Sequence, residues 1–295
     1  MHRLCLLLLA LTPALADEVE LTSGETVQGA LIYQASDALH LLTREGEREF
    51  PPAEVARVTP SDEGVTDTLR RRAAHLGQRL AKQRAGHARS WLKRATKGSE
   101  ERRQEALAAF QAFEGAARLS AAESAARDGV ALELALAELV SARAVDPLLQ
   151  VALGGKQQEA REAAHEAARS LDPDRAREAY TSVSHDAGVS PRTRYRALGH
   201  LAALRDPRAL PQLEVLVLHL QQEVRTALAE AKASRTARVD LSGGNTSLPV
   251  ELPEVHLIEL NSTQRFTVIQ ALLRRAEDVQ AALRALPPAP DPSER

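Results

Sequence analysis

The residues best suited to chemistry in this chain are a histidine and a glutamate at the start of an Ala-rich segment. His165-Glu166-Ala167-Ala168-Arg169 begins like the helix of a zinc protease. In such a helix, imidazoles at positions i and i+4 hold the metal and the glutamate acts as the base. Arg169 stands where the second histidine is required. The segment therefore does not predict a metal site.

Other residues that could support catalysis are isolated from one another. His185-Asp186 is typical of a helix end and a turn, and Ser242-Gly243-Gly244 lacks the strand-to-helix context of an anion-binding backbone loop. The sequence contains no phosphate-binding loop, nucleophile elbow or dinucleotide fingerprint. It therefore predicts no catalytic residue, no cofactor and no metal, and favours a protein that is not an enzyme. An envelope hydrolase with a site of another kind is an alternative.

The clearest chemical feature is a block of positive charge in a chain whose formal net charge is only −2. Residues 69–99 contain ten basic residues and no acidic one. Apolar residues from Leu69 to Leu80 recur every three or four positions, which predicts one helix from Leu69 to about Lys97. A face crowded with basic side chains is typical of polyanion binding. The candidate residues are Arg70, Arg71, Arg72, Arg79, Lys82, Arg84, Arg89, Lys93 and Arg94.

The charge of this helix has two interpretations. The preceding segment, residues 17–68, contains 12 acidic and 3 basic residues. If it packs on the helix, carboxylates such as Glu45, Glu47 and Glu49 would neutralise the basic face, and the sequence favours this masking. An open basic face would instead bind an anionic lipid headgroup, an envelope glycan or extracellular nucleic acid.

The acidic segment has the alternating apolar pattern of short strands. Four strands are predicted between residues 17 and 60, separated by tight turns such as Ser23-Gly24. Val27, Leu31 and Tyr33 are expected on one face, with a bend at Gly29. The succession of strand, Ser-Gly, strand with Gly, strand, Glu-Gly-Glu and strand resembles small SH3-like or Sm-like β barrels. The resemblance implies a docking or packing module, and the acidic charge argues against nucleic acid as its ligand.

A repeated pattern predicts the architecture of the larger, helical part. Three similar segments begin at Glu159, Arg192 and Glu223, 31 to 33 residues apart, and the first two are followed by Asp172-Pro173 and Asp206-Pro207. A period of this length with two helices per repeat is typical of a stacked helical solenoid. The Asp caps the second helix of each unit, and Pro is tolerated in its first turn.

One of these units resembles the HEAT-repeat family. Its first helix carries Leu198, Leu201 and Leu204 inward, and residues 206–213 look like the family's turn between helices. The resemblance implies an α-solenoid over residues 100–233 that serves as a scaffold, with its inner helices lining a concave groove. The groove residues that it implies are Arg177, Tyr180, Gln212 and His219.

Beyond the repeats, residues 234–262 contain a Gly-Gly and two prolines and are expected to be extended, with one strand over 255–260. Residues 263–286 predict a helix with an apolar seam at alternating spacings of three and four. The seam would cover the solenoid, which we favour, or form a dimer interface. Its residues are Ile269, Leu272, Ala276, Val279, Leu283 and Leu286.

The N-terminus predicts export. Met1-His2-Arg3 is basic, residues 4–11 are apolar, and Ala14-Leu15-Ala16 fits a cleavage site before Asp17. Removal of this signal would also remove Cys5 and leave a mature chain without cysteine. We expect a bacterial periplasmic or secreted protein without a transmembrane span.

The sequence therefore predicts a mainly α-helical protein preceded by a small β module. Its expected function is that of an exported, non-catalytic scaffold that binds another protein of the cell envelope. The first alternative is a binder of an anionic glycan, another polyanion or a membrane surface through residues 69–99. The expected division is 1–16 signal peptide, 17–60 β module, 61–99 basic helix, 100–233 solenoid, 234–262 extended segment, 263–286 C-terminal helix and 287–295 disordered tail.

Overall fold

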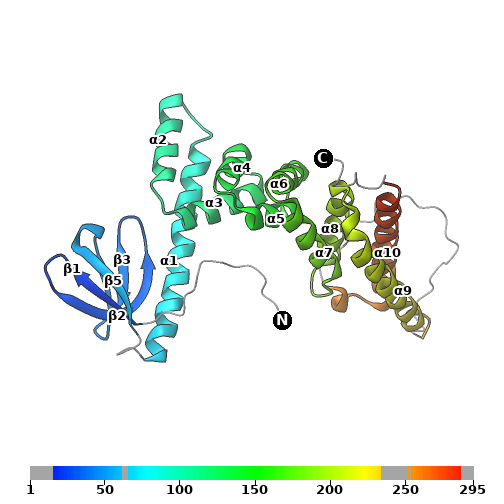
Figure 1. Cartoon of the computed structure of the whole chain (residues 1–295), viewed down its shortest axis with the longest axis horizontal. Helices are drawn as coiled ribbons and strands as arrows, with labels where there is room; N and C mark the ends of the chain where they lie inside the picture. The colour runs from blue at the N-terminus through cyan, green and yellow to red at the C-terminus, as the bar shows by residue number, and fades with distance from the viewer. Residues whose placement is uncertain (1–15, 62–65, 234–251, 253, 255, 287–295) are drawn as a thin grey trace, which may run out of the picture. The chain divides into compact units, whose positions relative to one another are not determined.

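The computed structural model describes residues 16–61, 66–233, 252, 254 and 256–286. The protein is mainly α-helical with an antiparallel sheet near its N-terminus, as the sequence predicts (Figure 1). The predicted signal peptide (apart from Ala16), most of the predicted extended segment and the Pro-rich tail lie outside the described residues.

The described chain forms two compact units. The N-terminal unit extends to Pro147 and also includes Gly155–Ala160, and the C-terminal unit consists of Leu148–Gly154 and the chain from Arg161 onwards. The helices are α1 Asp67–Arg94, α2 Glu100–Gln111, α3 Gly115–Asp128, α4 Leu132–Ser141, α5 Val145–Gly154, α6 Gln158–Leu171, α7 Pro173–His185, α8 Pro191–Leu204, α9 Leu210–Ala233 and α10 Ser262–Arg284.

The sheet has five described strands in the order β4-β3-β2-β1-β5, one more than the sequence pattern indicates. The last predicted strand is divided because Pro51 and Pro52 lead into a 3₁₀ turn, η1 (Pro52–Glu54), and proline cannot continue a hydrogen-bonded ladder. The strands are β1 Ala16–Leu21, β2 Thr26–Gln34, β3 Leu39–Leu42, β4 Glu47–Phe50 and β5 Val55–Ser61.

The sheet buries apolar side chains on both faces. One face carries a cluster that includes Val19, Leu41 and Phe50. The other face packs Ile32 and its neighbours against α1. Tyr33 belongs to this second cluster and not to the one that Val27 and Leu31 join, so the predicted shared face is wrong. The reason is an irregularity in the β2–β3 register between Leu31 and Tyr33.

Two glycines permit the closest approaches in this unit. A Cβ on Gly29 would lie 2.7 Å from the carbonyl oxygen of Leu42, so the glycine lets β3 pass close to β2. A Cβ on Gly77 of α1 would lie 2.2 Å from the carbonyl oxygen of Ile32. Real Cβ atoms do not approach an oxygen so closely, so α1 can lie this near to β2 only with glycine at position 77. One face of α1 is thereby fixed against the sheet.

The helices of the N-terminal unit use small residues in a similar way. α3 packs against α1 and α4, and α2 packs against α1. The buried residues of α3 are Ala117, Ala121, Ala122, Ala125 and Ala126. Alanine is the strongest helix former and lets helix axes approach closely, so this helix can be covered on several sides.

In the C-terminal unit the Asp-Pro turns behave as the sequence predicts. The carboxylate of Asp172 accepts a hydrogen bond from the Arg175 N–H and caps α7, and Asp206 caps the 3₁₀ turn η2 (Pro207–Ala209) before α9. The third repeat segment does not start a new helix, because α9 continues through Glu223 without a break. No Gly, Pro or capping residue stands there to end the helix.

The C-terminal helix covers its neighbours within the chain. α10 packs on α9 and α8, and five of its six seam residues are at most 2% exposed, Leu286 being partly exposed. Before it, the expected strand over 255–260 is wrong where the chain is described. Leu257–Glu259 form a 3₁₀ turn, η3, and Ile258 is 87% exposed, so no neighbouring strand covers it.

A candidate anion-binding site

The basic residues of α1 are divided between its two faces. Arg84 points inward, where its guanidinium binds Glu114 at 3.1 Å and Asp37 at 2.9 Å. Tyr33 donates a hydrogen bond to the same Glu114 carboxylate. Burial opposes ionisation of Glu114, but the hydrogen bonds from Tyr33 and Arg84 outweigh it and hold its pKa below the usual value. This network joins the sheet, α1 and the start of α3.

Arg89 also forms an ion pair on the packed side of α1. Its Nη2 lies 2.5 Å from Oδ2 of Asp128, whose other carboxylate oxygen lies 2.9 Å from the Lys156 ammonium. Hydrogen bonds from Lys156 and Arg89 hold the pKa of Asp128 below its usual value. Arg84 and Arg89 are therefore structural ion-pair partners and not part of an open anion site.

The carboxylates that the sequence suggested as partners lie elsewhere. Glu47 binds His40 at 3.4 Å, and no ion pair joins Glu45 or Glu49 to α1 in the part of the chain that the structure describes. All three lie in or just before β4, at the far edge of the sheet, whereas α1 packs on β2 and β3. The expected masking by these residues is therefore not seen.

The outward face of α1 keeps its charge. Within the described ranges, the basic residues on this face form no ion pair closer than 4.0 Å, and each of their side chains is exposed. We call these residues the basic ridge. They are Arg71, Arg72, Arg79, Lys82 and Lys93.

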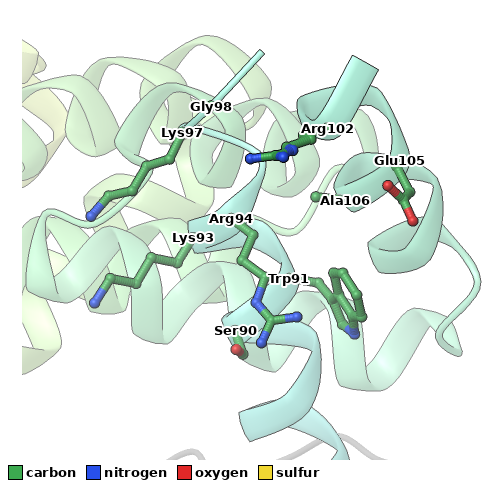
Figure 2. A pocket seen from close by; sticks show the side chains of 9 residues that line it. All are labelled: Ser90, Trp91, Lys93, Arg94, Lys97, Gly98, Arg102, Glu105 and Ala106. Atoms are coloured by element: carbon green, nitrogen blue, oxygen red, sulfur yellow. The ribbon is translucent and has the colours of Figure 1, made fainter. Parts of the chain in front are cut away.

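The ridge ends at a pocket of about 540 Å³ between the last turn of α1 and the first turns of α2 (Figure 2). We call it the basic pocket. Four cationic side chains and one carboxylate line it, together with the indole of Trp91. The cationic residues are Lys93, Arg94, Lys97 and Arg102, and the carboxylate is that of Glu105.

The arrangement of the pocket follows from the turn between the two helices. Gly98 has a φ of +92°, a conformation that other residues rarely adopt, and there the chain turns back so that Arg102 faces the end of α1. Figure 2 shows Lys93 and Lys97 extending in the same direction. The Arg94 guanidinium lies 4.6 Å from the centre of the Trp91 ring, a cation–π contact that orients it.

The electrostatics of the pocket favour an anion. None of its four cationic side chains has an ion pair with a described residue, so each would gain a partner when an anion enters. The first turn of α2 carries Glu100 and Glu101, which offset the positive end of that helix. The attraction for an anion therefore comes from the side chains and not from the helix terminus.

Sequence reasoning identified the ridge but only part of the pocket. Lys93 and Arg94 were among the predicted residues, whereas Trp91, Lys97 and Arg102 were not. The sequence Lys97-Gly98-Ser99 could have indicated these pocket residues, because a basic residue there precedes a helix break and the start of a new helix. Arg70, also predicted, lies 3.9 Å from Asp67 one turn away.

The predicted groove residues do not come together in one site. Tyr180 is fully buried, whereas a residue that lines a groove would be exposed. Arg177 binds Asp206 at 3.0 Å, and Gln212 and His219 are exposed on α9. Tyr180 is buried because its ring fills the contact between helices α6, α7 and α8, which sequence spacing alone could not indicate.

Tyr180 belongs to a buried cluster with two histidines. Its hydroxyl lies 3.0 Å from Nδ1 of His165, whose ring stacks on that of His200 at 4.5 Å between centroids. Burial lowers the pKa of His165 to about 4, and nearby His200 adds to this effect. His165 is therefore neutral at pH 7 and forms part of the core.

His185 and Asp186 form a helix end and a turn, as the sequence indicates. α7 ends at His185, and the Asp186 carboxylate accepts a hydrogen bond from the Gly188 N–H at 2.8 Å. Within the described ranges, no three His, Cys, Asp or Glu side chains gather closely enough to hold a metal ion. No described helix is long and apolar enough to cross a membrane.

Comparison of the chain with protein-family models, curated proteins and solved structures found no significant match. In the described structure, the basic pocket is lined by cationic residues from the end of α1, from the turn after it and from α2.

Proposed function

We propose that this protein is a non-catalytic binding protein that holds an anionic ligand in the basic pocket. The observation that carries the proposal is that four cationic side chains line one pocket, with a single carboxylate among them. On the packed side of α1, by contrast, Arg84 and Arg89 are paired with carboxylates. Basic groups held close together without partners favour an ion of opposite charge.

The pocket is suited to a ligand with several charged oxygens. Arginine presents a planar fork of donors that matches sulfate, phosphate or carboxylate, and lysine adds a mobile point charge. Arg94 is oriented by Trp91 before any ligand arrives, so less side-chain entropy is lost on binding. The remaining pocket cations are exposed and can adjust to ligands of different shape.

The rest of the chain is proposed to serve as a HEAT-like scaffold in an exported protein. The hairpins α6–α7 and α8–α9, each with an Asp-Pro turn, support this assignment within the C-terminal unit. The predicted signal peptide favours the periplasm or the exterior of the cell as the place of action. There the anionic ligand would be a component of the envelope or of the surroundings.

A heparin tetrasaccharide provides a compact, highly charged probe for the pocket. Isothermal titration calorimetry of the whole chain at low salt should detect its binding. The double variant Lys97→Glu/Arg102→Glu should weaken this binding on the order of tenfold or more, which corresponds to about 1.4 kcal/mol. Both side chains are exposed, so the fold should persist and thermal unfolding should be unchanged.

The matched control carries the same change of charge far from α1 in sequence. Arg225 and Arg274 are exposed on α9 and α10, and Arg225→Glu/Arg274→Glu should bind the tetrasaccharide like the unaltered chain. Equal losses in the two double variants would show that only net charge matters. That result, or no binding by the unaltered chain, would contradict the proposal.

A further inference from the structure

The basic ridge is a band of positive charge along the outward side of α1. Arg72, Arg79, Lys82 and Lys93 follow one another at intervals of 7, 3 and 11 residues, spacings that keep all four on one side of a helix. The other exposed positions on this stripe include His75, Gln83, Gly86 and Ser90, so no acidic side chain interrupts it.

The length of the ridge exceeds that of the pocket. Arg72 and Lys93 are 21 residues apart, which corresponds to about 32 Å along a helix. Lys93 belongs to both surfaces, because it ends the ridge and lines the basic pocket. The two surfaces are therefore continuous within the N-terminal unit.

The opposite face of α1 holds the ridge in place. Ala73, Gly77, Ala88 and Leu92 are buried on the packed side, and Gly77 lies against the backbone of β2. The helix cannot rotate to pair its outward cations with carboxylates of the sheet. The helix backbone that carries these charges therefore needs no further ordering when an extended ligand binds to it.

We propose that the ligand is a linear anionic polysaccharide that lies along the basic ridge and occupies the basic pocket with one segment. This inference rests on the proposed function and adds the class and length of the ligand. A compact anion would engage only the pocket, whereas the ridge cations beyond Lys93 would then serve no ligand. A chain with charges at regular intervals engages both.

The aromatic residues favour a glycan over single-stranded nucleic acid. Proteins that bind single strands offer aromatic rings on which the bases stack. Residues 69–90 of α1 contain no Phe, Tyr or Trp, and the Trp91 ring at the end of the ridge is already covered by the Arg94 guanidinium. A sulfated or uronic polysaccharide needs only the charges, and the predicted export of the chain brings it to where such polymers occur.

Chain length is the first variable that tests this inference. Affinities are compared per oligosaccharide molecule, that is, per reducing end. On this basis a heparin hexadecasaccharide should bind the protein at least tenfold more tightly than the tetrasaccharide, because only the longer ligand reaches the ridge. Its affinity should also fall more steeply with salt, since more counterions are released. Equal affinity per end and equal salt dependence for the two lengths would overturn the inference.

Two variants separate the ridge from the pocket. Arg72→Glu/Arg79→Glu should weaken hexadecasaccharide binding about tenfold or more and reduce its salt dependence, while tetrasaccharide binding stays unchanged. Arg71→Gln/Lys82→Gln, which removes charge without reversing it, should act in the same direction and guards against misfolding of the first variant. Arg225→Glu/Arg274→Glu is again the control and should retain both affinities.

The failures of the two proposals can be told apart. In one outcome, tetrasaccharide binding depends on Lys97 and Arg102, but the ridge variants do not change hexadecasaccharide binding. That outcome would overturn the inference and leave the proposed function standing. If the unaltered protein does not bind the tetrasaccharide, both the inference and the proposed function are overturned. Tighter binding of oligothymidylate of equal charge, or of phosphatidylglycerol vesicles, would overturn the polysaccharide as the class of ligand.

Discussion

The inward and outward faces of α1 are built from the same basic stretch of sequence, yet their cationic side chains differ in whether they form ion pairs. Arg84 and Arg89 meet carboxylates from the sheet and from the region of α3, and become part of the packing. Residues such as Arg79 and Lys82, close to Arg84 in sequence, remain exposed without an ion pair to a described residue. The contrast shows that a run of positive charge does not define a binding surface until the neighbours of each residue are known.

The strongest test of this comparison concerns what fixes the helix. Gly77→Ala would place a Cβ against the Ile32 carbonyl oxygen and should lower the free energy of unfolding by about 2–3 kcal/mol, because backbone cannot easily move aside. Gly86 lies on the outward face, where an added Cβ would have no atom within 4 Å, so Gly86→Ala should raise stability by about 0.5–1 kcal/mol. Urea unfolding of the two variants measures both effects, and equal responses would contradict the assigned faces.

A smaller effect is expected from the ion pairs of the inward face. Glu114→Gln should lower the free energy of unfolding by about 1–2 kcal/mol at pH 7, because Arg84 loses one of its two charged partners and keeps only Asp37. The pKa of Glu114 is lowered in the folded state. Its contribution is therefore fully present above pH 4.5, its usual pKa, and is lost as the pH falls through the lower folded value.

Unfolding of both proteins as a function of pH measures this contribution. The difference between Glu114→Gln and the unaltered chain should shrink as the pH falls below 4.5. Glu105→Gln is the matched control, because this carboxylate is exposed and has no ion pair with a described residue. It should leave stability unchanged, and a loss as large as that of Glu114→Gln would argue against the division of the two faces.

Local patterns in the sequence predict much of this fold. The Asp-Pro sequences predict the caps of the helical segments that follow them, and the apolar seam of α10 predicts its buried face. These features depend on residues a few positions apart. Where local rules compete, prediction fails: the continuity of α9 through Glu223 replaces the expected repeat boundary.

The candidate site was less predictable, because its partners are distant in sequence. Arg84 pairs with Glu114 and Asp37, which are 30 and 47 residues away. Charge composition suggested the acidic residues before and within β4, but the strand order puts them at the far edge of the sheet. Composition could indicate that some basic residues are neutralised, and only the fold shows which ones.

The central claim is that the unpaired cations of α1 and the following turn form the binding surface. Acetylation of lysines in the whole chain, with and without heparin hexadecasaccharide, tests it residue by residue when read by mass spectrometry. Heparin should protect Lys82, Lys93 and Lys97, whereas Lys156, which is 76% exposed but paired with Asp128, should keep its reactivity. Unchanged reactivity of the first three lysines, or equal protection of Lys156, would contradict the account.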